Sequence, residues 1–168
     1  GMHSASVFFD SLFNNAPDVS EQFVDKENVA LIFMTPHGEV FGMMFHPPLA
    51  PSGRKDLIVP DPHAFLFVFS SLKKATPVQI RLRPERRGDS IVGFVHANDD
   101  KLFVCGDPTA HFVFVPNDYH DGFRCGGLNL SKCFESDLSG FLFTKSKDDT
   151  PNVHGTRVLR VVMMQLSA

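Results

Sequence analysis

The chain has 168 residues and a formal net charge of −3 at pH 7, and 43% of its residues are hydrophobic. A chain of this length suits one domain, and it can bury a core without help from metals or disulfides. The acidic balance gives no overall attraction to nucleic acid, and no apolar run approaches the roughly 18 residues that a membrane-spanning helix needs. We therefore expect a soluble, cytoplasmic protein with no nucleic-acid partner and no membrane insertion.

The two ends of the chain and its cysteines refine this expectation. Gly1 ahead of Met2 is typical of a residue left by tag removal, so we expect a single domain over residues 2–168. The three cysteines, Cys105, Cys125 and Cys133, are odd in number and lack paired metal-type spacing. This usage indicates a reducing compartment instead of a disulfide framework, and it predicts no structural metal.

The N-terminal part of the chain predicts one short strand and one short helix. Residues 6–12 are β-prone, and an Asn-Asn-Ala-Pro stretch ends the run. Residues 18–24 begin with Asp18 as a helix cap, and Glu21 follows three residues later.

Residues 28–46 predict an apolar hairpin at the centre of the fold. Its strands, 29–34 and 40–45, are joined by a turn that contains Pro36 and Gly38. Proline presets φ for the first turn position, and glycine can take the left-handed conformation that follows. Because both strands are almost unbroken apolar runs, we expect both faces of the hairpin to be covered and the hairpin to lie inside a sheet.

The remaining chain predicts loops that alternate with strands. Residues 46–62 hold five prolines, which predicts a long surface loop without regular pairing. Residues 117–132 are rich in glycine, asparagine and aspartate and predict a functional loop or a bulged region. Strands are expected at 64–69, 78–83, 91–95, 102–105, 111–115, 140–144 and 156–166. The predicted fold class is mainly β (α+β), a β-sandwich of two antiparallel sheets with one or two short helices.

Several side chains could carry chemistry, and each has a structural alternative. His120 is close in sequence to Cys125 and Cys133, and a Cys/His pair makes a reactive thiolate when the two groups meet in space. No known cysteine-nucleophile signature surrounds either thiol, which favours structural cysteines. Glu39 and Asp118 stand at the ends of apolar strands, where a buried acid can act as a general acid or base but more often caps a turn.

Two further clusters are candidate ligand sites. His111, His120, Cys125 and Cys133 offer metal-compatible atoms, but their intervals do not match zinc spacings. A dense positive patch suits phosphate or carboxylate on a partner, although the wet face of a strand is the favoured interpretation. That patch consists of Arg81, Arg83, Arg86 and Arg87, with Lys73 and Lys74 nearby.

The order of these pieces resembles the TLDc domain, the module of the oxidation-resistance protein family. The closest stretch is LIFMTPHGEVFGMMFHPPLAPS at residues 31–52, which includes a Gly-Glu-Val-Phe-Gly hairpin. Further similar stretches lie at residues 64–70, 101–107, 111–118, 117–136 and 156–166. The chain looks like a divergent member that lacks the leading helix of the family and its glycine run before residues 111–115.

The resemblance implies a β-sandwich found in proteins that protect against oxidative stress, some of which regulate the vacuolar-type proton ATPase. It implies a protein partner, with V-ATPase subunits as candidates, and no cofactor. We expect a non-enzymatic binding or regulatory domain that uses loops 46–62 and 117–132. The alternative is an enzyme with thiol- or carboxylate-based chemistry, for peroxide reduction or hydrolysis. The candidate functional positions are Glu39, Gly42, His111, Asp118, His120 and Cys133.

Overall fold

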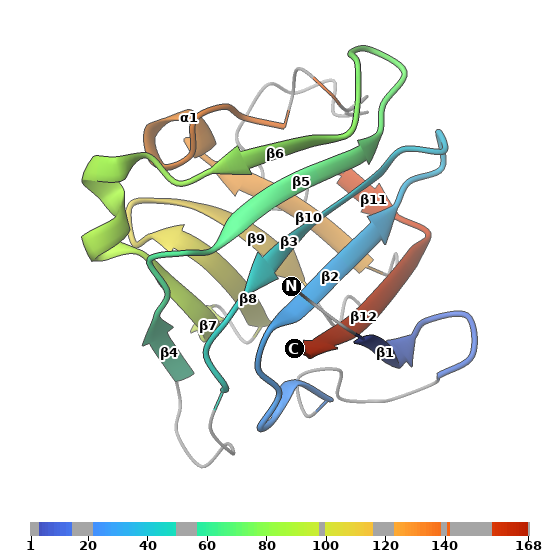
Figure 1. Ribbon diagram of the computed structural model, residues 1–168, viewed down its shortest axis with the longest axis horizontal. Coiled ribbons are helices and arrows are strands. Elements are labelled where there is room, and N and C mark those ends of the chain that lie inside the picture. The colour runs from blue at the N-terminus through green and yellow to red at the C-terminus, as the bar shows by residue number, and fades with distance from the viewer. Residues whose placement is uncertain are drawn as a thin grey trace.

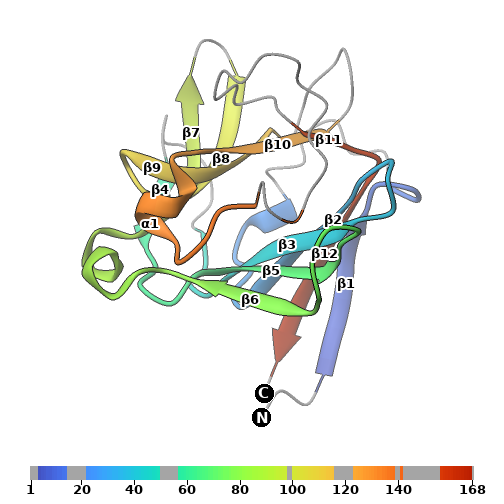
Figure 2. The same ribbon diagram turned by 90° about the horizontal axis from the view of Figure 1, so that it is seen from above.

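The computed structural model describes residues 4–14, 22–49, 57–97, 100–115, 123–138, 141 and 156–167. Within these ranges the chain forms two six-stranded antiparallel sheets. Figure 2 shows the sheets as two layers that face each other. The predicted β-sandwich is therefore confirmed.

The two sheets divide the chain as follows (Figure 1). The first sheet has the order β1 (Ser4–Asp10), β12 (Arg160–Ser167), β2 (Val29–Met34), β3 (Val40–Phe45), β5 (Phe65–Ser70) and β6 (Val78–Arg81). The second sheet has the order β11 (Thr156–Val158), β10 (Phe123–Leu128), β9 (Ala110–Val115), β8 (Asp100–Asp107), β7 (Ile91–Ala97) and β4 (Leu57–Pro60). The short helices are the 3₁₀ segment η2 (Pro84–Asp89) and the single turn α1 (Leu130–Cys133).

The β2–β3 hairpin lies inside the first sheet, as the sequence predicts. β2 pairs with β12 on one side, and β3 pairs with β5 on the other. Gly38 takes a φ of +83° in the turn, and the Thr35 amide donates to the Glu39 carbonyl oxygen at 3.0 Å. The prediction that both faces are covered holds for the inner face and in part for the outer one, where Ala30 and Met44 are buried but the half-buried Ile32 lines an open groove.

The core between the sheets is built from phenylalanine rings. Rings from the first sheet meet rings from the second at centroid separations of 5.1 to 5.8 Å, which is within the normal range for tilted aromatic pairs. The inter-sheet pairs are Phe33 with Phe112, Phe33 with Phe114, and Phe45 with Phe103. These rings have no polar atom, so they fill the interior without needing a hydrogen-bond partner.

The prediction that residues 46–62 form no regular pairing is wrong at their C-terminal end. β4 pairs with β7 in register from Leu57 opposite Phe94 to Pro60 opposite Ile91. Proline is tolerated there because β4 is an edge strand, and Pro60 is its last residue. The predicted loop is therefore interrupted by a strand that closes the border of the second sheet.

The predicted functional loop at 117–132 is also wrong in part, because it contains β10 and most of α1. β10 pairs with both β9 and β11 despite its Gly126-Gly127 pair. Packing favours glycine at position 127, since a Cβ on Gly127 would lie 2.4 Å from Leu130 Cγ. Gly127 therefore marks the close approach of α1 to β10, and it does not mark an irregular loop.

The predicted closing strand is split between the sheets. β11 belongs to the second sheet and β12 to the first, and Leu159 is the residue between them. Most of the predicted helix at 18–24 lies outside the described residues, and within it Phe23 is buried. Of the predicted strand at 140–144, only Phe141 is described, as a turn residue.

Candidate functional site

The six candidate positions fall in separate places. Glu39 and Gly42 belong to the β2–β3 hairpin, whereas His111 and Cys133 meet near the turn between β8 and β9. Asp118 and His120 lie outside the described residues. Of the four described positions, the structure brings His111 and Cys133 together through the backbone of Asp107.

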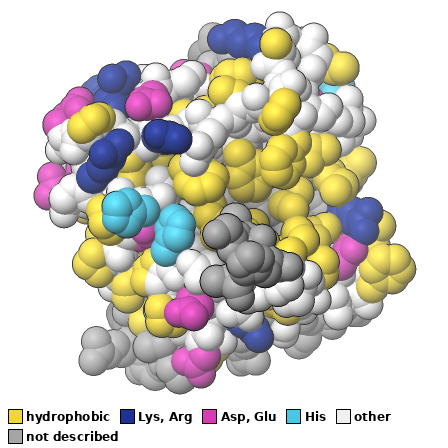
Figure 3. All heavy atoms as spheres, in the orientation of Figure 1, with side chains coloured by type: hydrophobic (Ala, Val, Ile, Leu, Met, Phe, Trp, Pro, Cys, Tyr) yellow, Lys and Arg dark blue, Asp and Glu magenta, His cyan; other side chains and the backbone are white. Residues whose placement is uncertain are grey.

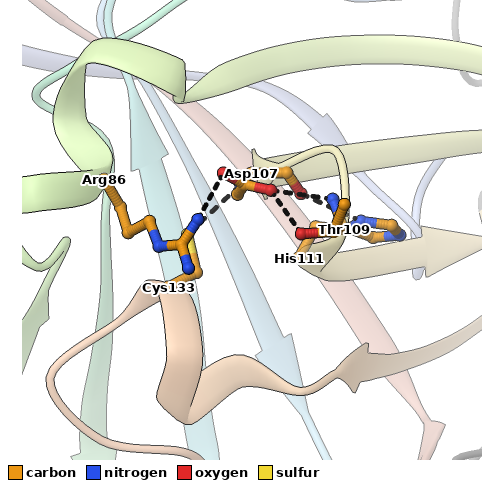
Figure 4. Close-up of polar contacts among 5 residues, drawn as sticks. All are labelled: Arg86, Asp107, Thr109, His111 and Cys133. Atoms are coloured by element: carbon orange, nitrogen blue, oxygen red, sulfur yellow. Dashed lines mark hydrogen bonds and ion pairs between the residues drawn. The ribbon is translucent and has the colours of Figure 1, made fainter.

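Asp107 is the centre of a polar cluster that connects η2 with the β8–β9 turn (Figure 4). Its Oδ1 accepts hydrogen bonds from the Thr109 amide at 2.9 Å and from the Thr109 hydroxyl at 2.7 Å. Its Oδ2 lies 3.3 Å from Nη1 of Arg86. The Thr109 hydrogen bonds, with the Arg86 guanidinium, hold the pKa of Asp107 below its ordinary value. Asp107 is therefore ionised, and its carboxylate stabilises the turn between β8 and β9.

Cys133 and His111 both bind the backbone of Asp107 (Figure 4). The Asp107 amide donates to the Cys133 Sγ at 3.2 Å, and His111 Nδ1 lies 3.2 Å from the Asp107 carbonyl oxygen. Since a carbonyl oxygen only accepts, His111 carries a proton on Nδ1 in this contact. The pair supports the geometry of the turn.

The thiols are poorly suited to nucleophilic chemistry. Cys105, Cys125 and Cys133 are all buried, and burial raises the pKa of each. The negative charge of Asp61 raises the pKa of Cys105 further. Because the thiolate is the reactive form, these thiols are predominantly neutral at pH 7.

Glu39 and Gly42 have packing roles. Glu39 is fully buried, and its Oε1 accepts a hydrogen bond from the Thr35 hydroxyl at 2.7 Å. The Glu39 amide in turn donates to Thr35 Oγ1 at 3.3 Å, so the two residues close the hairpin turn. A Cβ on Gly42 would lie 1.9 Å from the Leu31 carbonyl oxygen and 2.6 Å from the Phe67 ring, which requires glycine there.

An apolar groove on the outer face of the first sheet was not predicted from the sequence. Its volume is about 580 Å³, and apolar side chains from five strands form most of its lining. Figure 3 shows hydrophobic side chains gathered over this sheet. The lining residues are Ala30, Ile32, Met44, His46, Phe65, Phe67, Phe69, Pro77, Val78, Gln79, Met164 and Leu166. We call this surface the outer groove.

The strand register explains why the outer groove is apolar. Residues that are opposite each other on neighbouring strands share a face, and one row of partners crosses five strands. This row runs Met164, Ala30, Met44, Phe65 and Arg81. The outer face is thus apolar across β12, β2, β3 and β5, and it becomes cationic at β6.

A smaller cavity of about 320 Å³ adjoins the outer groove, since Phe65 and Gln79 line both. Its polar lining includes His63, Arg81 and Arg87. Figure 3 shows histidine and Lys or Arg side chains beside one another at one end of the hydrophobic surface. We call this cavity the cationic pocket.

Asp61 fixes the loop segments next to the cationic pocket. Its buried carboxylate accepts from the His46 amide at 2.9 Å and from the His63 amide at 3.1 Å. The rings of these two histidines are 6.4 Å apart, and His46 lines the outer groove. The same carboxylate therefore positions a histidine at the end of the groove and another in the pocket.

The sequence contained a signal for the outer groove. Phe65, Phe67 and Phe69 recur with the period of a strand, so they share the face opposite to the buried Leu66 and Val68. A continuous apolar run indicates two apolar faces, but it does not tell what covers each. Arg81 lies on the exposed face of β6, as its alternation predicts, and its row places it beside Phe65.

Comparisons with known proteins gave no match to a protein-family model and none to a curated protein. In the described part of the chain, none of the helices has the length and apolar character required to span a membrane. Among the same residues, no group of three or more His, Cys, Asp or Glu side chains is arranged to hold a metal ion.

Proposed function

We propose that this chain is a non-enzymatic binding or regulatory domain of TLDc type, and that it binds its protein partner through the outer groove. The resemblance of residues 31–52 to the family hairpin supports the family. Through that resemblance, the proposed role is oxidative-stress protection and regulation of the vacuolar-type proton ATPase. The single observation that carries the binding role is the groove itself.

An open groove with a mostly apolar lining favours binding. Contiguous apolar patches on soluble proteins commonly mark interaction sites, whereas isolated apolar residues do not. Phe69, which lines the groove, is 53% exposed, and covering its ring would remove apolar area from water. Aromatic side chains of this kind are the usual anchors of protein interfaces.

The alternative, thiol- or carboxylate-based catalysis, receives little support from the described residues. The three thiols are buried with raised pKa values. Glu39 is fully buried against Thr35, and Asp107 is committed to Thr109 and Arg86. None of these groups combines an exposed reactive atom with a neighbouring base.

The test compares two phenylalanine substitutions in binding to the soluble catalytic sector of the vacuolar-type proton ATPase. Phe69→Lys places a charge in the outer groove, whereas Phe13→Lys changes a ring that is 81% exposed and does not line it. We expect the wild-type chain and Phe13→Lys to bind and to change ATP hydrolysis. For Phe69→Lys, we expect an affinity loss of about thirtyfold, the size of an interface hot spot.

Two results would count against the proposal. Absence of binding by the wild-type chain would refute the vacuolar-type proton ATPase as partner. Equal affinity of the two variants, both folded by circular dichroism, would refute the outer groove as the binding surface.

A further inference from the structure

We propose that the outer groove binds an amphipathic α-helix of a partner protein, and that an acidic side chain at one end of this helix enters the cationic pocket. This inference rests on the proposed function, because it specifies the chemistry of the partner at the same surface. Three observations support it: the width of the groove, its opening to solvent on one side, and the positive charge of the cationic pocket at its end.

The width of the groove suits a helix. Its floor crosses β12, β2, β3 and β5, which are consecutive neighbours in the first sheet. Three strand spacings of about 4.8 Å each give a width of roughly 14 Å. An α-helix with its side chains has a diameter of about 10–12 Å, so one helix lying along the strands fills this width.

The length of the groove sets the spacing of the anchors on that helix. Phe65, Phe67 and Phe69 line the groove along β5. At about 3.4 Å per residue, they extend over roughly 14 Å, or between two and three turns of a helix. A helix docked there presents apolar side chains at positions i, i+3 or i+4, and i+7.

The open side of the groove argues for an amphipathic occupant. The outer groove lies on the outer face of the first sheet and is open to solvent on one side. Figure 3 shows the hydrophobic side chains of this face at the surface. An acyl chain is apolar all round, so one side of it would stay in water here, whereas small-molecule sites usually enclose most of their ligand. A helix with one apolar stripe and one polar face satisfies both environments. Added-strand pairing is not the mode, because it uses a sheet edge instead of a face.

Charge complementarity specifies the end of the helix. Arg81, Arg87 and His63 line the cationic pocket, and no carboxylate among the described residues lines either cavity. The Arg81 guanidinium contacts Gln79 Oε1 through Nε and Nη2 at 3.4 and 3.3 Å, at the boundary between the two cavities. Guanidinium groups bind carboxylates with paired hydrogen bonds, so an Asp or Glu of the partner fits there.

The probe for this inference is a displayed library of helical peptides of about 18 residues, which is five helical turns. It is selected on the full chain, on Phe69→Lys and on the double variant Arg81→Glu, Arg87→Glu. A control double variant, Lys74→Glu, Lys132→Glu, has the same charge change at two exposed lysines that line neither cavity. Selected peptides are then synthesised, and their affinities are measured by fluorescence anisotropy.

We expect peptides selected on the wild-type chain to carry apolar residues at i, i+3 or i+4, and i+7, with Asp or Glu at one end. Their affinity should fall at least about tenfold on the Arg81, Arg87 double variant and stay unchanged on the lysine control. Lysine in place of the peptide acid should restore binding to the arginine double variant. This charge exchange separates direct pairing from a general loss of folding.

The results that would contradict the helix inference differ from those that would contradict the proposed function. Selected peptides with strand-like alternation, or with no acid preference, would overturn the helix inference even where the vacuolar-type proton ATPase binds through the groove. Saturable binding of the fluorescent fatty acid cis-parinaric acid that Phe69→Lys abolishes would overturn it in favour of a lipid. Helical acidic peptides that bind while the ATPase does not would support the inference and refute only that partner.

Discussion

The guanidinium of Arg160 binds both carboxylate oxygens of Asp10. Its Nε donates to Asp10 Oδ1 at 3.0 Å, and its Nη2 donates to Oδ2. Asp10 and Arg160 are 150 positions apart in the sequence, and their pairing connects β1 with β12. The hydrogen bonds and the charge of Arg160 hold the pKa of Asp10 below its ordinary value of 3.8. A paired fork of this kind fixes orientation as well as charge.

Replacement of Asp10 by asparagine should make stability less dependent on pH in the acid range. A carboxylate whose pKa is lowered by folding stabilises the folded state above its unfolded pKa, and this contribution is lost as the pH falls through the folded pKa. We therefore expect Asp10→Asn to lower Tm at pH 6 and to approach the wild type well below pH 3.8. Thermal unfolding across this range tests it, and Arg160→Gln should show the same trend. An equal Tm difference at every pH would contradict the pairing.

Removal of the Glu39 carboxylate should reduce stability without a specific effect on binding. Glu39→Ala leaves the Thr35 hydroxyl without the acceptor that it has at 2.7 Å. The expected loss in the free energy of unfolding is about 1–3 kcal/mol, measured by urea denaturation. Glu39→Gln keeps an acceptor oxygen and should lose less. A stable Glu39→Ala protein that fails to bind a partner would instead make Glu39 a binding residue.

Addition of one methyl group at Gly42 should be strongly destabilising. The new Cβ would lie 1.9 Å from the Leu31 carbonyl oxygen, so the backbone or the Phe67 ring must move. We expect Gly42→Ala to lower the free energy of unfolding by about 1–3 kcal/mol or more. Gly88→Ala is the matched control, because its Cβ would meet nothing within 4 Å. Similar denaturation midpoints for the two variants would show that β3 can yield at this position.

The three thiols should react slowly in the folded protein. All are buried, and burial raises the pKa of each, so little thiolate is present at pH 7. We expect Ellman's reagent to modify none of them rapidly in buffer and all three after denaturation in guanidinium chloride. Fast modification of Cys133 alone would reopen thiol chemistry for this chain, and mass spectrometry of a trapped adduct would identify it.

The central hairpin could be predicted because its signals are local. The apolar runs at β2 and β3, and the turn residues Pro36 and Gly38, act within a few positions of one another. The sheet to which a segment belongs depends on pairing with distant strands. The separation of β11 from β12 at Leu159 therefore has no local signature in a β-branched run.

The candidate sites were less predictable, since residue type does not specify environment. His111 and Cys133 are candidates because of their reactive residue types, but the residue that joins them is Asp107, through its amide and carbonyl groups. Backbone groups are present at every position, so no sequence pattern marks this role. The outer groove was missed for a related reason, because an apolar face looks the same in sequence whether the chain or a partner covers it.

The passage of the chain at Leu159 from one layer to the other has a mechanical consequence. Because β11 and β12 form one continuous segment, the border strand β11 of the second sheet cannot detach without pulling on β12, which lies between β1 and β2 in the first sheet. The Leu159 amide also donates to the Met34 carbonyl oxygen at 2.8 Å, which ties this crossing to the central hairpin. The two sheets are thereby mechanically coupled. We expect the buried backbone amides of both sheets to undergo hydrogen exchange together, through a single cooperative opening.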